Sequence, residues 1–185
     1  MSLRCSVSLS LYGQAKGFML AELLVTLAII SLVSAIVIPN WRSGEQTLSL
    51  DRSVHQLAQD VRGVIEIALK AKPYQCAAPG ALSGYGAYFS LDTPSSFLFF
   101  ADCNNNQRYD AGADFIANTF SLEKGMQISE INPGSPASVV FIPPAPKVFI
   151  SPGEAAALQV AIAASGNPAS ARSIIINSRG VVDIE

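Results

Sequence analysis

An α+β fold, with one long N-terminal helix and an antiparallel sheet, is the fold class that this 185-residue sequence predicts. Three observations lead to it. An apolar run extends from Phe18 to Ile38, a helical pattern follows from Leu50 to Leu69, and short β-like segments between turns fill the rest. A helical first half followed by strands is typical of α+β folds, because α/β folds alternate the two kinds of element.

The apolar run is long enough to cross a membrane. Phe18 to Ile38 is 21 residues, which as a helix spans about 31 Å, close to the hydrocarbon thickness of a bilayer. Glu22 is the only charged residue in the run. A charged side chain costs about 2.5–3.5 kcal/mol at the centre of a bilayer and less near its surface, so Glu22 is a candidate functional residue.

The segment before the run is polar and basic, and it ends in Lys16-Gly17. A secretory signal peptide has its cleavage site after the apolar stretch, whereas here the suitable small residue, Gly17, comes before it. Arg4 and Lys16 precede the run and no acidic residue does. The positive-inside rule therefore places the leader in the cytoplasm and the C-terminal domain on the outer side of the membrane.

This junction resembles the class III signal of type IV pilins and type II secretion pseudopilins. The resemblance implies that prepilin peptidase cleaves after Gly17, that Phe18 becomes the N-methylated first residue, and that Glu22 is the glutamate that this family has at its fifth mature position. Met19 and Ala21 depart from the residues that are frequent there. The alternative is an ordinary single-pass anchor with a glutamate near its cytoplasmic end, which leaves the Lys-Gly-Phe junction unexplained.

The resemblance also implies a type IV pilin-like fold and a role for Glu22. The expected parts are a cleaved leader (1–17), a transmembrane and assembly helix (18–39) and a periplasmic or extracellular head (40–185). In a filament of parallel helices, the Glu22 carboxylate of one subunit meets the N-terminal ammonium of its neighbour. Two opposite charges buried together cost less than either charge buried alone.

After the run, Pro39 is expected to end or kink the helix, and Asn40-Trp41-Arg42 is typical of a membrane-interface anchor. An amphipathic helix then continues to Pro73, with the single His55 on its polar side. We expect its apolar face to receive the sheet, although such a face also suits a partner helix. The residues of that face are Leu50, Val54, Leu57, Val61, Val64, Ile65, Ala68 and Leu69.

Short β-like segments follow Pro73, separated by Pro- and Gly-containing turns. The last two form a hairpin around Ser178-Arg179-Gly180, and another turn is expected at Gly166-Asn167-Pro168. The nine expected strands are 85–91, 97–102, 114–122, 126–131, 138–142, 147–150, 158–163, 173–177 and 180–184.

Composition supports an anchored protein with one head domain. Half of the residues are hydrophobic and 14% are charged. Removing Arg4 and Lys16 with the leader leaves 10 basic and 14 acidic residues, a net charge of −4. About 145 residues remain after Pro39, which suffices for one compact core. No nucleophile–His–acid motif and no phosphate-binding glycine loop is present, so the sequence does not indicate an enzyme.

Two cysteines remain after the leader, with its Cys5, is removed. Cys76 and Cys103 form an even pair in an oxidising compartment, and no histidine or further cysteine lies beside either at a metal-ligand spacing. We expect a disulfide, with two free buried thiols as the alternative. On the loop-entropy model it stabilises the fold by about 3–4 kcal/mol.

A polar loop from Asp102 to Asp114 resembles part of a calcium-binding loop. Oxygen-bearing side chains occur at alternating positions, which suits Ca²⁺. Gln107 stands where the turn glycine belongs and Ala113 where a bidentate glutamate belongs. The alternative is a turn in which these side chains accept hydrogen bonds from their own backbone. The candidate ligands are Asp102, Asn104, Asn106, Asp110 and Asp114.

The layout is similar to that of GspH/FimT-like minor pilins and pseudopilins, and the segment from Arg172 to Val182 resembles the end of that family. Some competence-type members are thought to bind DNA around this last hairpin, where Arg172 and Arg179 are available here. Phosphate binding needs several cations acting together, and Asp183 follows where a further base is wanted. Nucleic acid binding is therefore the weaker interpretation.

The sequence as a whole predicts a structural subunit of a type IV pilus or a type II secretion pseudopilus, at the filament tip or in assembly initiation. Its expected partners are other pilin-type subunits, prepilin peptidase and an inner-membrane assembly platform. No cofactor is required, and calcium is an optional ligand. A minor pilin that binds DNA or a surface is the alternative function.

Overall fold

The computed structural model describes residues 20–70, 74, 76, 83–144, 147–153 and 155–185. Within these residues one helix, α1 (Leu20–Leu69), precedes nine strands. The chain divides into two compact units, one that ends at Arg42 and one, here called the head, that runs from Ser43 to Glu185. Helix α1 contributes residues to both units.

Helix α1 continues through Pro39, so the expectation that Pro39 ends the helix is wrong. Proline removes one backbone donor and crowds the carbonyl four residues before it. Helix α1 nevertheless remains helical on both sides of Pro39 along its 50 residues.

The head part of α1 buries the face that the sequence predicts. Ile65 is only half-buried and Leu69 is 52% exposed, so the assignment of Leu69 to the core is wrong. Leu69 lies one turn beyond Ile65 on the border of the buried face, and the core does not reach that border at the end of α1. His55 is exposed, as expected. The buried apolar residues of α1 are Leu50, Val54, Leu57, Ala58, Val61, Val64 and Ala68.

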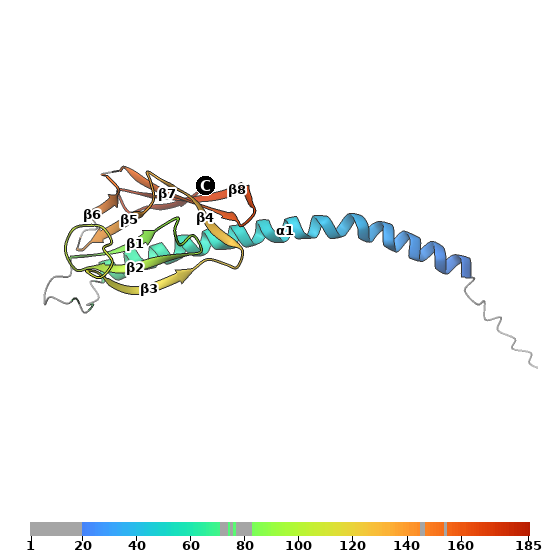
Figure 1. The fold of residues 1–185 in the computed structure, drawn as a ribbon, viewed down its shortest axis with the longest axis horizontal. Coiled ribbons are helices and arrows are strands. Elements are labelled where there is room, and N and C mark those ends of the chain that lie inside the picture. The colour runs from blue at the N-terminus through green and yellow to red at the C-terminus, as the bar shows by residue number, and fades with distance from the viewer. Residues whose placement is uncertain (1–19, 71–73, 75, 77–82, 145–146, 154) are drawn as a thin grey trace, which may run out of the picture. The chain divides into compact units, whose positions relative to one another are not determined.

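The described strands of the head form two antiparallel sheets, where the sequence predicted one, and the α+β class is confirmed (Figure 1). The first sheet has the strand order β3-β2-β1-β5-β6 and the second β4-β7-β8-β9. The strands are β1 (Gly84–Phe89), β2 (Ser96–Asp102), β3 (Phe115–Ser121), β4 (Met126–Asn132), β5 (Ala137–Ile142), β6 (Lys147–Ser151), β7 (Ala157–Ala164), β8 (Asn167–Asn177) and β9 (Val182–Ile184).

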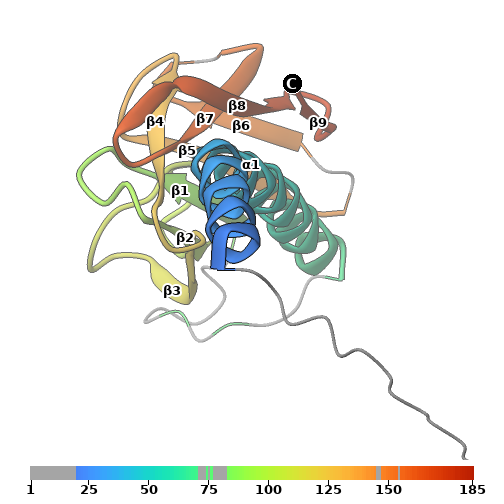
Figure 2. The ribbon, with the colours of Figure 1, turned by 90° about the vertical axis from the view of Figure 1, so that its right-hand side faces the viewer.

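One hydrophobic core joins α1 to both sheets, and Figure 2 shows strands of both sheets around the helix. Leu57 of α1, Phe97 of the first sheet and Ile174 of the second all belong to this core. Close packing inside the first sheet depends on Gly86, where a Cβ atom would lie 2.7 Å from the carbonyl oxygen of Val139. Because real Cβ atoms do not approach so closely, only glycine fits between β2 and β5 at this point.

All nine expected strands are present, and the largest difference is the start of β8. Ala164 pairs with Asn167, so the turn consists of Ser165 and Gly166 alone. Gly166 has a φ of 100°, which a two-residue hairpin loop accommodates readily at glycine. The expected turn at Gly166-Asn167-Pro168 is therefore wrong in its extent, because β8 already begins at Asn167. The final hairpin of β8 and β9 forms as predicted.

Candidate functional site

The first part of α1 presents an apolar surface that no other described residue covers. Leu20–Ile38 has a mean hydropathy of 2.5 and is long and apolar enough to cross a membrane. Every residue in this stretch except Ser34 is exposed. Burial of such a surface in lipid or against other helices is strongly favourable, since each fully buried Leu or Ile side chain contributes about 1.5–3 kcal/mol.

Glu22 lies in the first turn of α1 and is exposed. It is the only charged side chain between Leu20 and Ile38. A carboxylate at a helix N-terminus interacts favourably with the helix dipole. At the start of the apolar surface, the Glu22 carboxylate is accessible to a cation of another chain. Gly17 and Phe18 lie outside the described residues, so cleavage and methylation stay predictions.

Two of the three hydroxyl side chains in this stretch donate hydrogen bonds within the helix, which sequence reasoning did not anticipate. Thr26 Oγ1 donates to the carbonyl oxygen of Leu23 at 2.9 Å, and Ser31 Oγ donates to that of Ala28 at 2.9 Å. An unsatisfied polar group is costly in lipid. These two side chains are therefore compatible with a membrane-spanning helix.

A disulfide joins Cys76 to Cys103, with 5.5 Å between their Cα atoms. Cys103 follows β2 directly and is almost fully buried. The bond closes a loop with a sequence separation of 27. It ties the chain after α1 to the end of β2, close to an aromatic group in which Tyr74 contacts Phe99 and Phe115.

The candidate calcium loop is ordered by its own side chains. The fully buried Asp102 accepts hydrogen bonds from the backbone N–H groups of Asn105 (2.8 Å) and Gln107 (3.0 Å). Both donors have positive φ angles, 58° and 65°. Gln107, which occupies the place of the expected glycine, thus adopts the left-handed conformation that glycine favours.

Asp114 closes the same loop from the far side. Its carboxylate accepts the backbone N–H of Cys103 at 3.0 Å and that of Asp110 at 2.7 Å. Burial raises the pKa of Asp114, although these two hydrogen bonds act in the opposite direction. The structure therefore brings Asp102 and Asp114 to the two ends of one hydrogen-bonded turn.

The remaining candidate ligands pair with one another. The side-chain amides of Asn104 (3.0 Å) and Asn106 donate to Asp110 Oδ2, while Arg108 lies 3.5 Å from Asp110 Oδ1. Among the described residues, no group of three or more His, Cys, Asp or Glu side chains is arranged to hold a metal ion. The geometry matches the self-bonded turn, and calcium binding stays a prediction.

The two candidate DNA-binding arginines lie apart. Arg172, in β8, forms an ion pair with Asp51 of α1, with 3.4 Å from Nε to Oδ1. Arg179 is exposed in the β8–β9 turn, where the Asn177 side chain accepts its backbone N–H at 2.9 Å. Five residues of strand, about 17 Å at 3.3 Å per residue, separate Arg172 from Asn177. The two cations therefore do not lie side by side, and DNA binding through them stays a prediction.

Polar contacts between α1 and the sheets were missed at the sequence level. Glu123, between β3 and β4, accepts a hydrogen bond from Ser49 Oγ at 2.7 Å and one from Arg52 Nη1 at 3.2 Å. Arg62 Nη2 donates to the carbonyl oxygen of Val182 at 2.7 Å. These partners are more than 70 residues apart in the chain, and no local pattern reveals such pairs.

Comparison with known proteins gives structural likeness only. No family model and no curated protein matches the sequence. The type IV minor pilin FimU of Pseudomonas aeruginosa is similar in structure, with a TM-score of 0.48 and 10% identity over 74% of this chain and 87% of FimU. The minor pseudopilin EpsH of the Vibrio cholerae type 2 secretion system has a TM-score of 0.48 and 15% identity over 74% of this chain and 96% of EpsH.

Proposed function

We propose that this protein is a minor pilin or pseudopilin, a structural subunit that packs through the start of α1 into a type IV pilus or a type II secretion pseudopilus. The observation that carries the proposal is the exposed apolar surface of Leu20–Ile38 with Glu22 at its beginning. An anchor alone needs the apolar surface but gains nothing from a carboxylate in it, because the charge opposes insertion.

A helix-packed filament accounts for both features. Before assembly, the apolar surface lies in the inner membrane; after assembly, it lies against the helices of neighbouring subunits. Glu22 then neutralises the terminal ammonium that prepilin peptidase exposes at Phe18, and the pair sets the axial register between subunits. An ion pair of this kind specifies one arrangement among many, since removal of either partner leaves an unpaired buried charge.

The head supports placement outside the cytoplasm. Its disulfide between Cys76 and Cys103 suits an oxidising compartment, and the basic leader before the apolar stretch favours a cytoplasmic N-terminus. Because the chain is inserted through the start of α1, the assembly platform and the neighbouring subunits are its partners.

We place it at the filament tip, where a minor subunit helps to start assembly.

Removal of the Glu22 charge from the apolar stretch is the decisive test. The full chain with Glu22→Ala is compared with Glu45→Ala, which removes an exposed acid from α1 outside that stretch. We expect the first variant to accumulate in the membrane but to be lost from sheared filaments, and the second to be incorporated normally. Normal incorporation of Glu22→Ala contradicts the proposal.

Deletion of the gene distinguishes the two machines. Surface filaments and secreted proteins are measured in the same cultures. Loss of pili with normal secretion identifies a minor pilin, whereas retained pili with exoproteins trapped in the periplasm identify a pseudopilin. A deletion that changes neither contradicts both assignments.

A further inference from the structure

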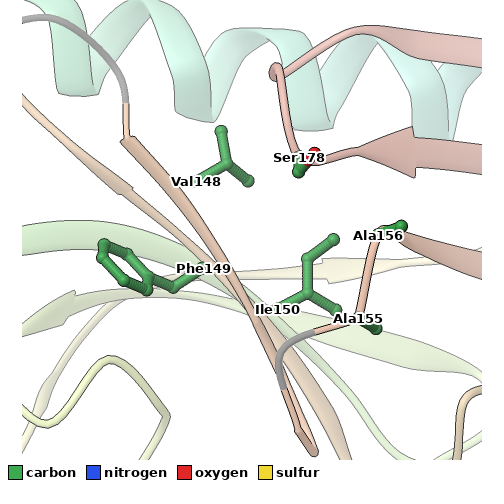
Figure 3. A pocket seen from close by; sticks show the side chains of 6 residues that line it. All are labelled: Val148, Phe149, Ile150, Ala155, Ala156 and Ser178. Carbon is green, nitrogen blue, oxygen red and sulfur yellow. The ribbon is translucent and has the colours of Figure 1, made fainter.

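A cleft of about 380 Å³ lies beside β6, the last strand of the first sheet (Figure 3). Its wall on the sheet side consists of β6, and its opposite wall comes from the two residues directly before β7 and from the turn between β8 and β9. The lining residues are Val148, Phe149, Ile150, Ala155, Ala156 and Ser178.

The cleft lies along the edge of β6 rather than on one face of the sheet. Val148, Phe149 and Ile150 are consecutive, and all three line it. Successive side chains of a strand point to opposite faces, so a hollow on one face meets only every second residue. Contact with three residues in a row therefore places the cleft at the backbone edge.

The edge of β6 that faces away from β5 carries backbone N–H and C=O groups that another strand can bind. Among the described residues, β6 pairs only with β5. In an antiparallel pair, every second residue of an edge strand directs its N–H and C=O groups away from the partner strand. The cleft is therefore bordered by hydrogen-bonding groups in the spacing of an extended chain.

The opposite wall leaves room for a backbone. Ala155 and Ala156 have small side chains, and the backbone N–H of Ser178 donates to the carbonyl oxygen of Ala156 at 2.9 Å, which ties the wall together. The hairpin turn also lies close to β6, because a Cβ atom on Gly180 would come within 3.5 Å of Val148 Cγ2.

We propose that this cleft binds an extended segment of a neighbouring filament subunit, which adds to β6 as a further strand. The inference rests on the proposed function, because that function brings a second subunit to the head. Main-chain hydrogen bonds to β6 supply the affinity, and the apolar cleft selects small apolar side chains at every second position of the segment. None of the described residues that line the cleft is cationic, so a peptide fits it better than a phosphate-bearing ligand.

The other free edge of the same sheet is the natural comparison. Within the part of the chain that the structure describes, strand β3 also pairs on one side only, with β2. Its Phe115 and Ile116 are exposed. The cleft at β6, in contrast, has a second wall that would position a strand, and Thr119, exposed in β3, therefore serves as the control position.

The first measurement is site-specific photocrosslinking within assembled filaments. The full chain carries p-benzoylphenylalanine in place of Phe149, or in place of Thr119 as the control, and sheared filaments are irradiated and analysed by mass spectrometry. We expect Phe149 to give an adduct with a non-helical segment of another subunit at least tenfold more often than Thr119. Adducts to helical residues, or equal yields from both positions, overturn the proposal.

A matched pair of variants tests the cleft itself. Ser178→Trp fills it, whereas Arg179→Trp places the same side chain on the next residue of the turn, which does not line it. We expect the first to abolish the Phe149 adduct and the second to preserve it, while both keep the disulfide and the thermal midpoint of the unmodified chain. Ala156→Leu is the second blocking variant if Ser178→Trp does not fold.

The proposal and the function beneath it fail in different ways. If filaments incorporate the chain in a Glu22-dependent manner but the adduct survives both blocking variants, the strand-binding cleft is wrong and the filament role stands. If Glu22→Ala is incorporated normally, the filament role itself is wrong and the inference about the cleft falls with it.

Discussion

Arg62 of α1 donates a hydrogen bond of 2.7 Å from Nη2 to the carbonyl oxygen of Val182, the first residue of β9. Strand β9 has only three residues and pairs with β8 alone among the described strands. A side chain 120 residues earlier therefore helps to hold the end of the chain in place. This contact joins the helix to the hairpin that borders the cleft at β6.

Removal of this contact should destabilise the head. A hydrogen bond from a charged donor contributes about 1.5–3 kcal/mol when well shielded, and Arg62 is partly exposed, so we expect Arg62→Ala to lower the free energy of unfolding by about 1 kcal/mol. Urea denaturation measures the loss. Arg108→Ala is the control, because its exposed ion pair with Asp110 should contribute about 0–1 kcal/mol. Equal effects of the two changes contradict the anchoring role of Arg62.

A buried hydroxyl on α1 predicts a stabilising substitution. Ser53 is 2% exposed, and its Oγ is buried without a hydrogen-bond partner among the described residues. Ser53→Ala removes that cost and improves helix propensity, so we expect a gain of about 1 kcal/mol in the free energy of unfolding. Ser49→Ala, which loses a bond to Glu123, should change stability in the opposite direction. Thermal or urea unfolding of the two variants measures these changes in stability. If Ser53→Ala destabilises the head instead, the Ser53 hydroxyl has a hydrogen-bond partner in solution and the prediction is wrong.

The apolar spacing of the second half of α1 made the buried face of this helix predictable. Val54, Leu57 and Val61 repeat at three- and four-residue steps and are buried as the pattern indicates. The strands were predictable for the same reason, because apolar segments and turn residues are local signals. Helix and strand boundaries were less so: the Ser165-Gly166 turn is shorter than the Gly-Asn-Pro sequence suggests.

Some functional features are likewise visible in the sequence, whereas others arise only in the folded structure. Glu22 stands out because it is the only charged residue in an apolar run. Cys76 and Cys103 stand out because they are the only two cysteines after Gly17. The cleft at β6 was not predictable, since Ala156 and Ser178 meet β6 only after both sheets have formed. Likewise, nothing local in the sequence indicates that Asp51 pairs with Arg172 at 3.4 Å.

The pH dependence of stability should reveal Asp60. Burial raises its pKa above the ordinary value of 3.8, so the folded state favours the protonated form. This contribution is fully present below pH 3.8 and is lost as pH rises through the raised pKa. Asp60→Asn remains neutral, and we expect it to gain stability relative to the unmodified chain between pH 3 and pH 7. Gln59→Asn is the control, because it neither adds nor removes a titratable group. Its difference in stability from the unmodified chain should be the same at pH 3 and at pH 7. If the difference for Asp60→Asn is also the same at both pH values, the burial effect is contradicted.

Calcium removal tests the polar loop after β2. Asp102 and Asp114 already accept four backbone N–H groups, so the turn is held together without an ion. We therefore expect EDTA to leave the thermal midpoint of the full chain unchanged, and millimolar CaCl₂ to raise it only if the loop side chains rearrange. A midpoint that falls in EDTA and recovers with CaCl₂ but not MgCl₂ would show that calcium is structural here.

Loss of the disulfide should destabilise the head more than any single hydrogen bond. The bond closes a loop with a sequence separation of 27, and on the loop-entropy model this is worth about 3–4 kcal/mol. We expect Cys76→Ser to lower the free energy of unfolding by about that amount, because the chain after α1 is then free in the unfolded state. The double variant Cys76→Ser with Cys103→Ser is the control for an unpaired buried thiol, and it should lose a similar amount. If the reduced and oxidised forms of the unmodified chain unfold at the same urea concentration, the bond does not stabilise the head.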